Sequence, residues 1–107
     1  MSASTAGKAW HKVAEAGDVA DGAVTEAAVG KTVLALVRIG DRYAALHGRC
    51  PHAGGPLAQG SLEGGRLVCP WHGREYDPFT GQCEGYAEAA RTCAVEARAD
   101  GIYVALE

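Results

Sequence analysis

The sequence predicts an all-β fold: a small antiparallel β-sandwich with a Gly/Pro-rich subdomain inserted at about 47–83. Short runs rich in β-branched and aliphatic residues alternate with turns that contain Gly, which is typical of strands joined by hairpins. Eight of the 15 glycines lie between Gly48 and Gly81, and this density excludes regular helix from the insertion. The 107 residues are the length of one domain, so a single unit, 1–107, is expected.

The clearest strand is expected at 32–39, because aliphatic and β-branched residues fill it. Gly40 and Asp41 supply a two-residue turn, and 42–46 returns as the second strand of a hairpin. The segment 23–29 is too weakly patterned to assign. The other expected strands are 9–13, 67–69, 75–77, 91–98 and 102–106, the last two joined by a turn at 99–101.

Composition and charge exclude several classes of protein. Hydrophobic residues make up 48% of the chain and charged residues 21%, as in a globular and not a disordered protein. The net charge is −3, so the basic surface that nucleic-acid binding needs is not expected. The longest apolar run, 33–37, is far shorter than the ~20 residues that span a bilayer. The first residues show no export signal, so we expect a cytoplasmic location and cysteines that are ligands or free thiols.

Two Cys/His pairs carry the chemistry of this sequence: Cys50-Pro-His52 and Cys69-Pro-Trp-His72. Two Cys and two His are a common ligand set for zinc, although one residue between Cys50 and His52 is a tight spacing for it. A [2Fe–2S] cluster held by two Cys on one iron and two His on the other uses the same four residues. A structural zinc site and an iron–sulfur cluster are therefore both open on these residues alone.

The residues around the two pairs resemble the cluster loops of Rieske ferredoxins. The run Cys-Pro-His-Ala-Gly-Gly-Pro-Leu at 50–57 is similar to the first loop of that family. The run Cys-Pro-Trp-His-Gly at 69–73, followed by Tyr76-Asp77 and Thr80-Gly81, is similar to the second. The resemblance implies one Rieske [2Fe–2S] cluster per chain, with Cys50, His52, Cys69 and His72 as its ligands. It also implies supporting roles for Pro51, Gly54, Gly55, Pro70, Trp71, Gly73 and Tyr76.

The resemblance is to the branch of the family that lacks a disulfide between the loops. The high-potential branch carries one extra Cys in each loop, and the matching positions here are Gly55 and Trp71. Tyr76 matches a tyrosine of the high-potential branch whose hydroxyl donates a hydrogen bond to a ligand thiolate, and Cys50 is its expected acceptor; many disulfide-free ferredoxins have Phe at this position. The segment 84–91 departs from the pattern, because the family often has a Pro-containing loop there that covers the cluster.

Several side chains outside the four ligands have simple expected roles. Trp71 is expected either to dock a partner or to cap the cluster. Four arginines, at 42, 49, 66 and 74, are expected on a solvated face, with steering of an acidic partner as the alternative. We expect Trp10 and Tyr103 in the core, His11 and His47 on the surface or in loops, and Cys83 and Cys93 as small apolar residues or half-exposed thiols.

The resemblance implies an electron carrier and not an enzyme, with no catalytic residues of its own. The sequence has no GxGxxG run for a dinucleotide. The implied donor is a flavoprotein NAD(P)H reductase and the implied acceptor a terminal oxygenase, docking transiently at a tip formed by His52 and His72. A monomer with no nucleic-acid or membrane partner is expected. The alternative is a small subunit of a stable reductase such as nitrite reductase, held by an apolar interface above ~2,000 Å².

Overall fold

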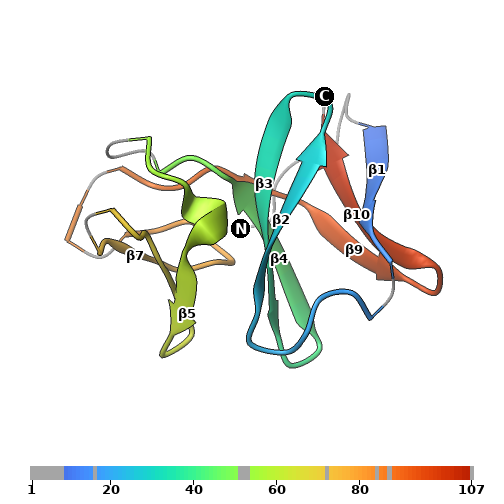
Figure 1. Cartoon of the computed structure of the whole chain (residues 1–107), viewed down its shortest axis with the longest axis horizontal. Helices are drawn as coiled ribbons and strands as arrows, with labels where there is room; N and C mark the ends of the chain where they lie inside the picture. The colour runs from blue at the N-terminus through green and yellow to red at the C-terminus, as the bar shows by residue number, and fades with distance from the viewer. Residues whose placement is uncertain are drawn as a thin grey trace.

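A computed structural model describes residues 9–15, 17–50, 54–71, 73–83, 85–86 and 88–106. This part of the chain contains antiparallel strands, one short 3-10 helix and no α-helix, so the all-β prediction is confirmed (Figure 1). None of the described segments is a helix with the length and apolar character needed to cross a membrane. The strands are β1 Ala9–Ala14, β2 Val24–Val29, β3 Thr32–Ile39, β4 Arg42–His47, β5 Ser61–Glu63, β6 Arg66–Val68, β7 Glu75–Tyr76, β8 Thr92–Cys93, β9 Val95–Arg98 and β10 Gly101–Leu106, and the 3-10 helix η1 is Leu57–Gln59.

The strands form three sheets, in the orders β1-β10-β9, β2-β3-β4-β8 and β5-β6-β7. Figure 1 shows β5 and β7 on one side of the central sheet and β1, β9 and β10 on the other. The predicted hairpin of β3 and β4 is confirmed, and its turn uses Gly40 at φ +62°. The small sheet β5-β6-β7 lies inside the predicted insertion.

Strand β3 is buried on both faces because it separates two hydrophobic cores. Successive side chains of a strand point to opposite faces, and this accounts for the unbroken apolar run that the sequence carries here. Leu34 and Leu36 belong to the sandwich core, which consists of Val19, Ala27, Leu34, Leu36, Ala45, Cys93, Ile102 and Val104. Ala35 and Val37 belong to the insertion core, which consists of Ala35, Val37, Ala44, Leu46, Cys50, Leu57, Ala58, Leu67, Cys69, Tyr76, Cys83 and Ala90.

The prediction of one strand over 91–98 is wrong. The segment forms two strands that belong to different sheets: β8 pairs with β4, and β9 pairs with β10. Ala94 lies between them, and its carbonyl accepts a hydrogen bond from the backbone N–H of Ala105 at 3.0 Å. The chain therefore crosses from one layer of the sandwich to the other at this point.

Two further strands form in segments for which no strand was predicted. Strand β2 pairs with β3 along its whole length, from Val24 opposite Val37 to Val29 opposite Thr32. Its alanines are poor strand formers, so pairing with β3 decides the structure of the segment. Strand β5 pairs with β6 in the insertion.

The prediction that Trp10 and Tyr103 lie in the core is also wrong. Both are half-buried and flank the Arg98 guanidinium, whose carbon lies 5.5 Å from the Trp10 ring centroid and 4.1 Å from that of Tyr103. On β10 the inward positions are taken by Ile102 and Val104, so the side chain of Tyr103 between them faces outward. Its hydroxyl donates to Asp100 at 2.7 Å.

Candidate metal centre

The two cysteine loops share one backbone frame. In the first loop the N–H of Cys50 donates to the carbonyl of Gly55 at 2.8 Å, and the N–H of Gly54 donates to the carbonyl of Cys50 at 2.7 Å. In the second loop the N–H of Cys69 donates to the carbonyl of Arg74 at 2.9 Å, and the N–H of Gly73 donates to the carbonyl of Cys69 at 3.0 Å. In each loop, therefore, the backbone of the cysteine is hydrogen-bonded to the residues four and five positions later.

Glycine is required at the same place in each frame. Gly54 has φ +72° and Gly73 has φ +74°, a left-handed conformation that glycine adopts without the steric cost of a Cβ. The predicted histidines, His52 and His72, fall between the cysteine and the closing hydrogen bonds of each loop, but they lie outside the described residues. Pro51 also lies outside them.

The two loops bring Cys50 and Cys69 into one hydrophobic core. Cys50 is 3% exposed and Cys69 is 1% exposed, and both side chains belong to the insertion core. Cys83 is buried in the same core, whereas Cys93 is buried in the sandwich core. None of the four cysteines, all of which lie among the described residues, is in a disulfide. The burial of Cys83 and Cys93 among apolar side chains agrees with the expectation that they behave as small apolar residues.

Tyr76 lies beneath the first loop with its hydroxyl 3.1 Å from the Cys50 sulfur. The tyrosine is fully buried on β7. Burial raises its pKa well above that of an ordinary tyrosine, and the hydrogen bond to Cys50 raises it further. The hydroxyl therefore stays protonated and donates the hydrogen bond whenever Cys50 is a thiolate. The predicted contact between Tyr76 and Cys50 is confirmed.

Gly55 and Trp71 occupy adjacent places between the loops. A Cβ added to Gly55 would lie 2.9 Å from Cγ of Trp71 and 3.1 Å from the Cys69 sulfur, so no larger residue fits without movement. The Trp71 ring nevertheless remains 58% exposed. It thus lies against Gly55 on one side and presents apolar surface to solvent on the other. Pro70 beside it is exposed.

Arg74 joins the second loop to the segment that departs from the family pattern. Its guanidinium carbon lies 3.7 Å from the centroid of the Tyr86 ring, and its Nη1 donates to Oε1 of Glu88 at 2.7 Å. The Arg74 side chain is only 13% exposed as a result. Sequence reasoning missed Tyr86 and Glu88, and the aromatic residue that follows Gly85 is the one signal that could have pointed to this contact.

The described residues fit part of the predicted ligand set. Within them, no group of three or more His, Cys, Asp or Glu side chains is arranged to hold a metal ion, because the two predicted histidines fall outside. The described part nevertheless offers two sulfur ligands. Two buried sulfurs stand in matched loops, and one of them is hydrogen-bonded to a buried hydroxyl.

Comparison with known proteins agrees with this arrangement. The family model described as Rieske [2Fe-2S] domain matches residues 9–97. Ferredoxin CarAc of Metapseudomonas resinovorans is 36% identical over 73 residues, which cover 67% of this chain and 68% of that protein. A solved structure, a complex of reduced oxygenase and oxidised ferredoxin in carbazole 1,9a-dioxygenase, contains a chain that matches with a TM-score of 0.80 and 31% identity, covering 90% of this chain and 92% of that one.

Part of a much longer protein is also similar. Apoptosis-inducing factor 3 of Homo sapiens is 38% identical over 69 residues, which cover 64% of this chain. The match spans 11% of that protein, so the chain corresponds to about a tenth of its length.

Proposed function

Because this chain belongs to the Rieske [2Fe–2S] domain family, we propose that it is a one-electron carrier and that Cys50, His52, Cys69 and His72 hold its cluster. The observation that carries the proposal is the pair of matched loops that bury Cys50 and Cys69 in one core. When bound there, a cluster of this type accepts and releases a single electron. The proposal adds no catalytic residue.

The chain's own residues would set the environment of the two thiolates. Burial of both sulfurs excludes water from them. The Tyr76 hydroxyl donates to Cys50 and thereby stabilises negative charge on its sulfur. The Arg74 guanidinium contacts the Tyr86 ring and donates a hydrogen bond to Glu88, so these contacts hold it in place of a hydrogen bond to the metal centre. With no disulfide between the loops, we expect a potential near the lower end of the family's range of roughly −150 to +300 mV.

We propose a flavoprotein NAD(P)H reductase as electron donor and a terminal oxygenase as acceptor. The similarity to ferredoxin CarAc, and to a chain in a complex of oxygenase and ferredoxin, supports the acceptor. The reductase is the donor that the family resemblance implies, and a carrier must be reloaded with a single electron after each delivery. The exposed ring of Trp71, beside the second loop, would form part of the transient docking patch near His52 and His72.

The test is the absorption and electron paramagnetic resonance spectra of the aerobically purified protein, before and after dithionite, together with its iron and zinc content. Two iron atoms per chain and a resonance that appears only on reduction are the expected results. A colourless protein that contains zinc would overturn the proposal. Co-purification in a stoichiometric, salt-resistant complex would instead favour a small subunit of a stable reductase.

A further inference from the structure

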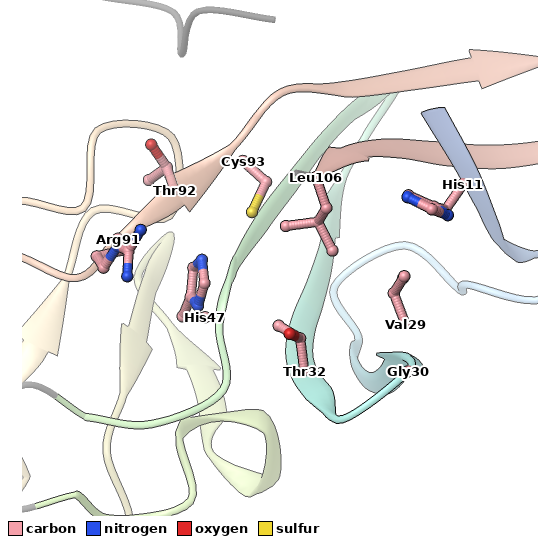
Figure 2. Close-up of a pocket in the computed structure, with 9 residues that line it drawn as sticks. All are labelled: His11, Val29, Gly30, Thr32, His47, Arg91, Thr92, Cys93 and Leu106. Carbon is pink, nitrogen blue, oxygen red and sulfur yellow. The ribbon is translucent and has the colours of Figure 1, made fainter. Parts of the chain in front are cut away.

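A cleft runs across the end of the sandwich, beyond the proposed metal centre. It consists of two adjoining cavities of about 540 and 430 Å³, which share Thr32, His47 and Arg91 in their walls. The larger cavity continues to Cys93, and the smaller one reaches Cys50 in the first cysteine loop. Figure 2 shows Arg91, Thr92 and His47 gathered at one end of the larger cavity, with His11 at the other.

The charge of the cleft is opposite to that of the chain. Lys31, Arg49 and Arg91 line it, from three segments far apart in the sequence. Among the described residues that line the two cavities, none is acidic, although the chain has 13 Asp and Glu against 10 Lys and Arg. Within the described part of the chain, no carboxylate forms an ion pair with any of these three cations.

The arginines elsewhere behave differently. Arg74 is paired with Glu88, Arg98 is paired with Glu96, and the Arg42 guanidinium lies 3.8 Å from the ring centroid of Phe79. Like charges that share a concave surface repel one another, and the repulsion is relieved by a counter-anion. Among the described residues, Lys31, Arg49 and Arg91 thus bring three positive charges together in the cleft with no carboxylate paired to them.

The walls also offer polar groups on a fixed frame. Thr32 and Thr92 contribute hydroxyl groups to the lining of the larger cavity. The backbone N–H of His47 donates to the carbonyl of Arg91 at 2.8 Å, and the N–H of Gly48 donates to the carbonyl of Val33 at 2.8 Å. These bonds hold the three cationic segments next to one another. Guanidinium and hydroxyl donors around a concave site suit the oxygens of phosphate and carboxylate groups.

We propose that this cleft binds a small oxyanion, a phosphate or a carboxylate compound free in solution. Its volume is that of a site for a small molecule, and its cations approach from several sides as a compact anion requires. An anion held there would also oppose the arrival of further negative charge in the neighbouring Cys50 loop. The effect of the anion on charge in the Cys50 loop rests on the proposed function, whereas binding of the anion does not.

The binding test is an amide NMR titration of the oxidised, cluster-loaded full chain with inorganic phosphate, at constant ionic strength maintained with chloride. We expect saturable shifts at Lys31, Thr32 and Thr92. Arg91→Gln and Lys31→Gln should each weaken the binding of phosphate at least tenfold. Arg98→Gln removes the same charge from β9, outside the cleft, and should leave the affinity unchanged.

Two results would overturn the proposal. Shifts that do not saturate, or that are equal in Arg91→Gln and Arg98→Gln, would mean that phosphate only screens the surface. Binding of a hexaglutamate peptide without binding of phosphate or citrate would assign the cleft to an acidic protein partner. The midpoint potential gives a separate readout, since linkage equates tenfold tighter binding to the oxidised protein with a lowering of about 59 mV. Cluster loading is checked independently by iron content, so failure of the proposed function and failure of the anion site are distinguishable.

Discussion

The two cysteine loops have the same backbone frame but different surroundings. Both close through hydrogen bonds four and five residues after the cysteine, and both turn on a glycine with positive φ. The first sulfur, that of Cys50, receives the hydroxyl of Tyr76. The second sulfur, that of Cys69, lies 3.1 Å from the place that a Cβ on Gly55 would take.

The comparison shows that different residues position the two thiols and set the electrostatic environment of their sulfurs. Placement is duplicated, because each loop needs only a cysteine and a glycine at fixed spacing. The described surroundings are not duplicated, because the Tyr76 hydroxyl contacts the Cys50 sulfur whereas the Cys69 sulfur lies close to Gly55. Substitution of either cysteine should therefore remove the centre, a side chain added at Gly55 should obstruct it, and loss of the Tyr76 hydroxyl should shift its properties.

The largest effect is expected from the cysteines themselves. Cys50→Ala or Cys69→Ala should abolish iron binding and lower the free energy of unfolding by several kcal/mol, because cofactor binding contributes directly to folding. His52→Ala and His72→Ala should do the same. Cys83→Ala and Cys93→Ala are matched controls, one buried thiol from each core. Iron content and thermal melting are the measurements, and full iron in His52→Ala would contradict the ligand assignment.

The next effect comes from the space between the loops. Gly55→Ala places a Cβ 2.9 Å from Trp71 and 3.1 Å from the Cys69 sulfur, so most of the iron should be lost. Gly54→Ala is the matched control: among the described residues, the atoms nearest its Cβ belong to the flexible end of Arg49, at 3.3 Å. Its φ of +72° costs roughly 1–2 kcal/mol of stability, but iron should remain.

A second substitution sharpens the Gly55 result. Trp71→Ala removes the ring that the new methyl group meets first, so the double variant Gly55→Ala, Trp71→Ala should recover iron. Absorption per chain at the visible bands measures the recovery. If the double variant contains as little iron as Gly55→Ala, the new methyl group prevents cluster binding through the Cys69 sulfur and not through the Trp71 ring.

A smaller effect is expected at Tyr76. Tyr76→Phe removes one hydrogen bond to Cys50, of about 1 kcal/mol, which corresponds to roughly 40 mV for one electron. A donated hydrogen bond is stronger when the acceptor carries more negative charge, so it favours the reduced state and its loss lowers the midpoint. Voltammetry should show this lowering with a nearly unchanged visible spectrum. A midpoint within a few millivolts of the original would mean that the ring only packs.

The smallest effect is expected at the contact between Arg74 and Glu88. Glu88→Gln weakens an ion pair whose acidic partner is half exposed, so the melting temperature should fall by a few degrees at most and iron should remain. Salt screens exposed pairs, so the difference should shrink in 1 M NaCl. Thermal melts at low and high salt measure it. An equal loss at both salt concentrations would mean that the pair acts through packing.

The sequence predicted the features that depend on local pattern. The hairpin of β3 and β4 follows from its aliphatic run and its Gly-Asp turn, and the contact between Tyr76 and Cys50 follows from family resemblance. Features that depend on distant neighbours were not predictable. The change of sheet at Ala94 has no local signal, because a chain that crosses between layers and one that continues have the same alternation. Trp10 and Tyr103 look like core residues until Arg98 is seen between their rings.

The position of β3 between the two cores has a consequence for how the molecule unfolds. The same strand supplies Leu34 and Leu36 to one side and Ala35 and Val37 to the other. Opening the insertion would expose one face of a strand whose other face is still packed, so neither half can melt without weakening the other. We therefore expect one cooperative transition, with the amides of β3 exchanging their hydrogens only through global unfolding. A cofactor bound in the loops would then slow hydrogen exchange in the sheet β1-β10-β9, although it contacts no residue there.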